Sequence, residues 1–184
     1  MDEAKAVLRT DGKVVLLGGM GYDPDGVLAT SEVYDPKTGI WTGGKEMTAR
    51  REYDAATILA DGKVLAVGGF DPDYGALSSA DLSDADHAGS EVWGWGGSMS
   101  TRRLGATATL LPNGLVLVAG GQLGPGKDAV ASAEFYDSGA YPNAFRPANP
   151  MAETRDGHTA TLLPGGQVLV VGGFSPSGTT AGAE

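Results

Sequence analysis

The sequence predicts an all-β protein built from a repeated four-stranded antiparallel unit, which is the pattern of a β-propeller blade. Three observations carry this prediction: a period of about 52 residues, a short apolar run in each period, and a turn signal before each run. Glycine pairs mark the period, because their first members lie 50, 52 and 52 residues apart. The pairs are Gly18-Gly19, Gly68-Gly69, Gly120-Gly121 and Gly172-Gly173.

Each period is expected to open with a tight hairpin. Apolar runs at 14–17, 64–67, 116–119 and 168–171 end at the glycine pairs and read as short strands buried on both faces. A second short strand precedes each of them, at 6–8, 56–59, 108–111 and 160–163. Between the two strands stand Asp11-Gly12, Asp61-Gly62, Asn113-Gly114 and Gly165-Gly166, pairs that favour a type I′ turn.

Two further strands complete each unit. The third carries an acidic residue followed by an apolar one, at 32–35, 81–84 and 134–137. The fourth carries one aromatic residue, and Trp41, Trp93 and Phe145 follow each other at intervals of 52 residues. The chain is therefore expected to hold about three and a half blades, at approximately 4–45, 54–97, 106–149 and 158–184, the last of them incomplete.

One partial propeller is expected to fill residues 1–184. Residues 181–184 look like the approach to another third strand, so the chain is expected to stop inside its fourth blade. A propeller closes its ring to cover the face of every blade. Missing blades of the same chain, or alternatively a second copy, are therefore expected partners, and a piece of a longer protein is the favoured interpretation.

The order of these signals resembles the kelch motif: an apolar run ending in double glycine, then Tyr-Asp, then Trp about seven residues later. Residues 14–41 match it best, and the resemblance covers essentially the whole chain. The residues that carry it, besides the glycine pairs, are Tyr34, Trp41, Trp93, Tyr136 and Phe145. Ser83 replaces the tyrosine in the second unit. The resemblance, to bacterial kelch repeat-containing proteins and galactose-oxidase-like propellers, implies a kelch-type β-propeller, commonly of six or seven blades.

The composition of the chain limits the partners and the kinds of functional site that can be expected. Thirteen Lys and Arg against 23 Asp and Glu give a net charge of −10, which repels nucleic acid. The absence of cysteine removes disulfides, thiolate metal sites and a cysteine nucleophile. No apolar stretch is long enough for a membrane-spanning helix. We expect no cofactor, no metal and no catalytic residues, and the likeness to bacterial extracellular kelch proteins favours an extracellular or cell-surface location.

The candidate binding residues lie at one rim of the predicted propeller, where the long connections gather. Arg51, Arg103 and Arg155 recur at intervals of 52 residues, and Arg50 and Arg102 precede the first two. A ring of guanidinium groups could hold carboxylates of a ligand. The favoured alternative is that each arginine pairs with a repeated acid such as Glu32, Asp81 or Glu134 and so ties neighbouring blades, since packing contacts repeat whereas binding sites are usually asymmetric.

Other features of this rim are less regular. His158 replaces Asp54 and Ala106 of the other units and could act as a base or ligand, with a hydrogen-bonded structural histidine favoured. Four aromatic residues could offer apolar platforms to a sugar or a peptide, although singly exposed aromatics are also common without any role: Tyr22, Tyr53, Tyr74 and Trp95. Acid pairs at 23 and 25 and at 71 and 73 could hold calcium, but solvated turns are favoured.

The sequence thus predicts a non-catalytic scaffold that binds a protein or glycan through its long-loop rim. The alternative is the propeller segment of a secreted carbohydrate-active enzyme resembling the galactose-oxidase group. A copper-radical centre of that group needs a cysteine cross-linked to tyrosine, and this chain has no cysteine. A third possibility is a structural spacer in a surface protein.

Overall fold

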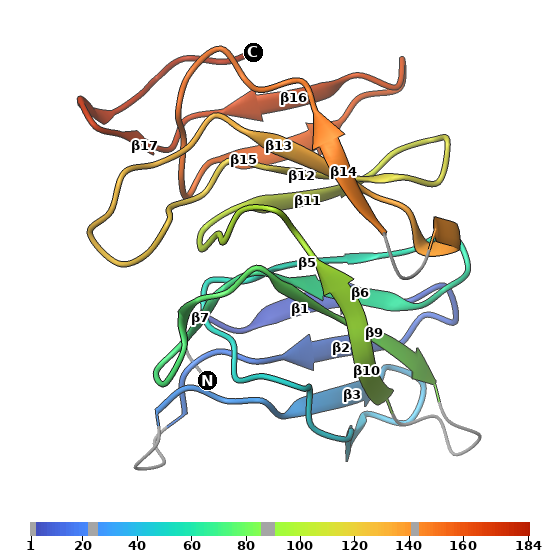
Figure 1. Ribbon diagram of the computed structural model, residues 1–184. Coiled ribbons are helices and arrows are strands. Elements are labelled where there is room, and N and C mark those ends of the chain that lie inside the picture. The colour runs from blue at the N-terminus through green and yellow to red at the C-terminus, as the bar shows by residue number, and fades with distance from the viewer. Residues whose placement is uncertain (1–2, 22–25, 86–90, 141–143) are drawn as a thin grey trace.

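The computed structural model describes residues 3–21, 26–85, 91–140 and 144–184, and it confirms the all-β prediction (Figure 1). Three four-stranded antiparallel sheets follow one another along the chain, each with neighbouring strands in sequence order apart from an inserted hairpin in the second. A two-stranded sheet begins the fourth unit. We call these sheets blades 1 to 4.

Blade 1 consists of β1 (Lys5–Leu8), β2 (Val14–Leu17), β3 (Ser31–Asp35) and β4 (Ile40–Gly43). Blade 2 consists of β5 (Ala55–Ile58), β6 (Val64–Val67), β9 (Ser79–Ala85) and β10 (Glu91–Ser98). Blade 3 consists of β11 (Thr107–Leu110), β12 (Val116–Ala119), β13 (Ala133–Tyr136) and β14 (Phe145–Ala148), with the 3-10 turn η1 (Ser138–Ala140) before its last strand. Blade 4 contains β15 (Thr159–Leu162) and β16 (Val168–Val171).

Two small hairpins stand in the loops after the glycine pairs. They are β7 (Phe70–Asp71) with β8 (Gly75–Ala76), and β17 (Phe174–Ser175) with β18 (Gly178–Thr179). Beyond the second hairpin, Val171 forms an isolated bridge with Ala183. Val170 and Glu184 also exchange backbone hydrogen bonds of 2.8 and 3.0 Å. The expected third strand of blade 4 thus begins at the end of the chain.

The opening hairpins form with a turn different from the predicted type I′ turn. Gly12 donates its N–H to the Arg9 carbonyl and has a φ of 87°, but Asp11 is not in the positive-φ region. A type I′ turn needs positive φ at both central residues, whereas a type I turn followed by one left-handed glycine needs it once. The same pattern recurs at Gly62, Gly114 and Gly166.

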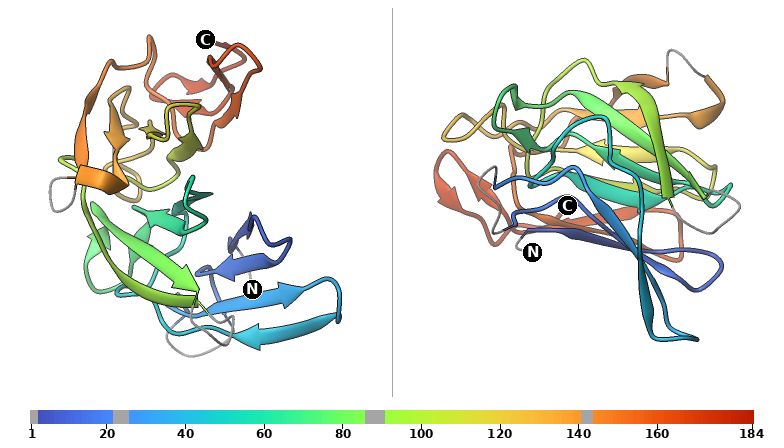
Figure 2. Two further views of the ribbon diagram at one scale, coloured as in Figure 1. Left: turned by 90° about the vertical axis from the view of Figure 1, so that its right-hand side faces the viewer. Right: turned by 90° about the horizontal axis from the view of Figure 1, so that it is seen from below.

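The blades follow an arc, with the first strand of each on the concave side (left view of Figure 2). Neighbouring first strands pack on one another from β1 through β5 and β11 to β15. Two apolar clusters fill the spaces between blades. Val15, Leu17 and Trp93 belong to the cluster between blades 1 and 2, and Leu65 and Val118 to the one between blades 2 and 3.

Blades 1 and 4, at the two ends of the arc, expose apolar side chains whose repeat equivalents are buried between blades. Leu65 in blade 2 is fully buried, while its repeat equivalent Leu169 in blade 4 is 37% exposed. Trp93 is 8% exposed and donates its indole N–H to the Ser31 hydroxyl of blade 1, while Trp41 of blade 1 is 49% exposed. The number of blades in a closed ring stays a prediction. Among the described residues, no helix is long and apolar enough to cross a membrane.

Candidate binding rim

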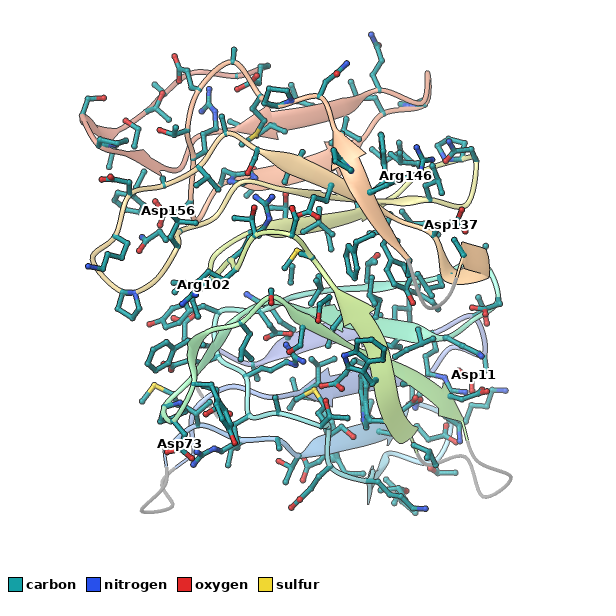
Figure 3. All side chains as sticks on the ribbon, viewed as in Figure 1. Asp11, Asp73, Arg102, Asp137, Arg146 and Asp156 are labelled. Atoms are coloured by element: carbon teal, nitrogen blue, oxygen red, sulfur yellow. The ribbon has the colours of Figure 1, made fainter. Side chains whose placement is uncertain are left out.

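The blades present two different rims. The long connections after the glycine pairs and between blades share one side, on which Asp73, Arg102 and Asp156 lie (left side of Figure 3). Asp11, Asp137 and Arg146 lie on the opposite side, with the short turns (right side of Figure 3). We call the first side the long-loop rim and the second the short-turn rim.

The three repeated arginines precede blades 2, 3 and 4 on the long-loop rim, but their side chains turn inward. Arg51 and Arg103 are fully buried and Arg155 is 2% exposed. The Arg51 guanidinium donates to the Asp81 carboxylate at 2.9 and 3.1 Å and to the Gly68 carbonyl at 2.7 Å. It also donates to the carbonyl and the hydroxyl of Ser79, both at 3.0 Å. Arg51 therefore clamps β6 to β9 inside blade 2.

Blades 3 and 4 repeat this clamp. Arg103 donates to Glu134 at 3.2 Å and to the Gly120 carbonyl at 2.9 Å. Arg155 donates to Glu184 at 3.1 Å and to the Gly172 carbonyl at 2.8 Å. The expected pairs with Asp81 and Glu134 are therefore present, but the expectation that they tie neighbouring blades is wrong, because each pair lies within one blade. Glu32 forms no ion pair with the described residues, and Glu184 is the third acid instead. A ligand-binding role for these three arginines stays a prediction.

The backbone of the same arginines joins neighbouring blades. Gly19, Gly69 and Gly121 each donate their N–H at 2.7 Å to the carbonyl of Arg51, Arg103 and Arg155, respectively. The glycine pair of one blade is thus bound to the arginine of the next. The glycine pairs and the repeated arginines therefore belong to one contact between neighbouring blades. In the sequence they appeared only as two separate periodic signals.

Tyr53 lies two residues beyond the first arginine, with an unusual backbone. Its φ is 53°, while its repeat equivalents Gly105 and Gly157 have φ values of 68° and 60°. Gly105 donates its N–H to the Tyr53 carbonyl at 2.8 Å, and Gly157 donates to that of Gly105 at 2.9 Å. The Tyr53 side chain is 40% exposed. A tyrosine therefore occupies a left-handed position for which glycine is the unstrained residue.

His158 and Asp54 occupy equivalent repeat positions beside a cavity of about 240 Å³, which Lys5 and Thr107 also line. His158 Nε2 lies 3.0 Å from the Thr107 hydroxyl, and its Nδ1 has no partner among the described residues. Burial and the nearby Arg155 lower the pKa of the imidazole. Burial raises the pKa of Asp54 to about 7, against the opposing effects of Arg51 and Lys5. A role of His158 in binding or catalysis stays a prediction.

The two acid pairs have different outcomes. Asp23 and Asp25 lie outside the described residues. Asp71 accepts the backbone N–H of Asp73 at 2.8 Å and that of Arg50 at 3.2 Å. The Arg50 guanidinium forms ion pairs with both carboxylates. In the described part of the chain, no group of three or more acids and histidines could hold a metal ion.

Arg102 is a rim residue that the sequence marked only as the neighbour of the repeated Arg103. It is the repeat equivalent of Arg50, but Leu123 and Pro125 stand where an acid pair would meet it. Arg102 is exposed and forms no hydrogen bond or ion pair with the residues that the structure describes. It lines a surface hollow of about 240 Å³ with Tyr74, Ala76, Leu77, Ser78 and Ser79. The sequence signal that could have singled out Arg102 is the replacement of both acids in the loop of blade 3.

A second hollow of about 180 Å³ lies between the loops of blades 3 and 4. Its lining includes Gln122, Lys127, Asp156 and Phe174. A third hollow, of about 500 Å³, is lined by Glu153, Ser175 and Thr180, among others, at the loops of blade 4. These hollows follow the long-loop rim, and each is formed by the long loops and the connections between blades.

Comparisons with known proteins agree with the fold. No protein-family model matches the chain. A kelch repeat and BTB domain-containing protein of Caenorhabditis elegans is 32% identical over 99 residues, which cover 50% of this chain and 15% of that protein. The solved structure of YjhT, a kelch-type propeller, matches with a TM-score of 0.79 at 14% identity, covering all of this chain and 65% of that one. The chain thus spans less than two thirds of either protein, and its fold is that of a kelch-type β-propeller.

Proposed function

We propose that this kelch-type propeller segment is a non-catalytic scaffold that binds a protein partner on its long-loop rim. One observation carries the proposal: surface hollows lie along this rim between the long loops and the connections that join the blades. Loops held by a rigid scaffold are where binding residues concentrate. Kelch-type propellers commonly act as protein-interaction modules, which favours a protein over a glycan.

The difference between the two rims supports this choice. On the short-turn rim, the hairpin turns satisfy their own backbone groups, as in the 3.0 Å bond from Gly12 N–H to the Arg9 carbonyl. On the long-loop rim, aromatic and charged side chains remain exposed beside the hollows, among them Tyr74 and Lys127. Exposed tyrosine and arginine side chains beside a hollow are common anchors of protein interfaces, and Tyr74 and Arg102 line one of these hollows.

The experiment is a selection of binding peptides with the full chain as bait. A phage library of random sixteen-residue peptides is the probe, and selected peptides are measured by fluorescence anisotropy. The rim variant is Tyr74→Ala with Lys127→Ala. The matched control on the opposite rim is Lys37→Ala with Arg146→Ala.

The proposal expects selected peptides that compete with one another and lose at least fivefold in affinity on the rim variant, with less than twofold change on the control. Peptides that lose affinity only on the control variant would place the binding site on the short-turn rim and overturn the proposal. A folded chain that selects no peptide, but retains sugars on a glycan array, would overturn the protein assignment.

A further inference from the structure

We propose that the hollow between Tyr74 and Arg102 holds the side-chain carboxylate of an acidic residue in the bound peptide. The proposal rests on the protein-binding function above and names the chemistry of its central contact. Arg102 lies on the long-loop rim between the labelled positions of Asp73 and Asp156 (Figure 3). Its guanidinium group is the donor of the proposed contact.

Comparison of Arg102 with Arg50 gives the first argument. The two residues precede equivalent buried arginines, and Arg50 is neutralised by Asp71 and Asp73 of the loop in its own blade. In the next blade, Leu123 and Pro125 replace those acids. One copy of the repeat thus carries its own carboxylates, and the next lacks them. A ligand carboxylate would restore at Arg102 the pairing that the chain supplies at Arg50.

The other walls of the hollow suit the rest of an acidic side chain. Tyr74 is 77% exposed and offers an apolar ring face and a hydroxyl group. The Ser79 hydroxyl accepts a 3.0 Å hydrogen bond from Arg51, so its own proton is left for donation. Neither a described acid nor a described carbonyl takes that proton. The residues that line the hollow therefore include a charged donor, Arg102, and a neutral hydroxyl donor, Ser79.

The size of the hollow favours one side chain over a larger ligand. Its volume is about 240 Å³. Sites for drug-sized molecules occupy roughly 300–1,000 Å³ and are more enclosed. A single anchoring side chain from an extended peptide fits this volume, and the rest of the peptide would lie along the rim. The chain has a net charge of −10, so an exposed arginine with no ion-pair partner among the described residues is a local positive charge that an acidic ligand can pair with.

The experiment compares two libraries of twelve-residue peptides that differ at one position. The central residue is Glu in one library and Gln in the other, and the remaining residues are random. The variant Arg102→Gln removes the cation, and the matched control Arg146→Gln removes an exposed arginine of the short-turn rim. A second variant, Leu123→Asp with Pro125→Asp, keeps Arg102 and rebuilds the acid pair of the preceding loop.

We expect binders to come mainly from the Glu library and to lose at least tenfold in affinity on Arg102→Gln. The rebuilt acid pair should lower affinity by a similar factor, because its carboxylates occupy the guanidinium. Arg146→Gln should change affinity less than twofold. Affinity should also fall as NaCl is raised from 50 to 500 mM, since the contact is exposed.

Equal binding by the two libraries, or no effect of Arg102→Gln, would overturn the carboxylate site while leaving rim binding of peptides intact. Absence of binders from both libraries and from the random library would overturn both proposals together. Free glucuronate is a further probe, and Arg102-dependent binding of glucuronate without any peptide binding would show that the occupant is a sugar acid.

Discussion

The backbone N–H of Gly69 in blade 2 donates a 2.7 Å hydrogen bond to the carbonyl of Arg103, which begins blade 3. The neighbouring Gly68 sits so close to the same carbonyl that a Cβ built on it would lie 2.4 Å from the oxygen. The side chain of Arg103 then clamps its own blade through Gly120 and Glu134. The glycine pair of blade 2 is thus hydrogen-bonded to the arginine that precedes blade 3, and the side chain of that arginine holds two segments of blade 3 together.

The first prediction concerns the cost of a methyl group at this contact. Gly68 and Gly172 have φ values of 68° and 69°, so alanine suffers the same backbone strain at both, roughly 1–2 kcal/mol. At Gly172, however, the nearest atom to a built Cβ is the Thr180 carbonyl oxygen at 3.8 Å. We expect Gly68→Ala to lower the free energy of unfolding by about 1–3 kcal/mol more than Gly172→Ala.

Urea unfolding followed by circular dichroism measures this difference, and the two variants serve as each other's control. Equal destabilisation by the two alanines would show that backbone strain alone limits these positions. It would then contradict the close approach of neighbouring blades as the reason for the glycine.

The second prediction concerns the buried arginine clamps. Arg51 and Asp81 are both fully shielded from solvent, so Arg51→Ala leaves an uncompensated buried carboxylate and should cost about 3–5 kcal/mol of unfolding free energy. Arg155 pairs with Glu184 and Glu153, which are partly exposed, at 26% and 56%. Water can solvate those carboxylates after Arg155→Ala, so the cost there should be smaller. Urea unfolding of both variants checks the order.

Lys37→Ala, in an exposed turn of blade 1, is the control and should change the unfolding free energy by less than about 0.5 kcal/mol. A double variant, Arg51→Met with Asp81→Leu, removes both charges and should recover most of the loss. If the double variant were as unstable as Arg51→Ala, charge burial would not be the cause of the loss.

The third prediction concerns the strained backbone at Tyr53. Because φ is 53° there, glycine should be more stable than alanine at this position, by about 1 kcal/mol after its larger unfolded-state entropy is counted. The comparison of Tyr53→Gly with Tyr53→Ala removes the side chain in both variants, so only the backbone differs. Thermal unfolding of the two variants measures the difference.

The same substitutions at Lys37, which is outside the positive-φ region, should show the opposite order or no difference. Alanine equal to or better than glycine at position 53 would refute the strain. A confirmed strain would mark Tyr53 as a position where the chain keeps a side chain against its backbone preference, which is common at functional sites.

Most of the fold could be predicted from the sequence because its repeat compares four copies of one pattern. The strand positions follow from apolar runs closed by glycine pairs, and the structure confirms them. The turn type was predicted wrongly, because Asp-Gly suits both a type I′ turn and a type I turn followed by a left-handed glycine. Only the φ of Asp11 and its equivalents separates the two.

The candidate site was less accessible to sequence reasoning. The period drew attention to three arginines, Arg51, Arg103 and Arg155. The structure buries their side chains, and each of them pairs with an acidic residue. Arg102 looked like part of the same repeat, and only the three-dimensional pairing of Arg50 with Asp71 shows that Leu123 stands in place of an acid that would pair with Arg102. Departures from a repeat become informative once the role of the repeated residue is known.

The last prediction concerns the pH dependence of stability. Asp54 is 1% exposed, neither of its carboxylate oxygens has a partner among the described residues, and burial raises its pKa to about 7. The ordinary value is 3.8. Between these two pH values the folded chain keeps a proton that the unfolded chain has released. The stabilisation is therefore complete below about pH 3.8 and is lost as the pH rises through about 7.

Asp54→Asn cannot titrate, so its unfolding free energy relative to the original chain should rise between about pH 4 and 7 and then level off. The full change is at most roughly 4 kcal/mol, since each pKa unit corresponds to about 1.4 kcal/mol. Urea unfolding at intervals from pH 4 to 8 measures it. Asp54→Ala should show the same pH profile at a different absolute stability, because it too lacks the carboxyl group. A difference from the original chain that does not vary with pH would mean that the native carboxyl group is ionised and finds solvent or a partner, for instance Lys5, across the cavity that both residues line.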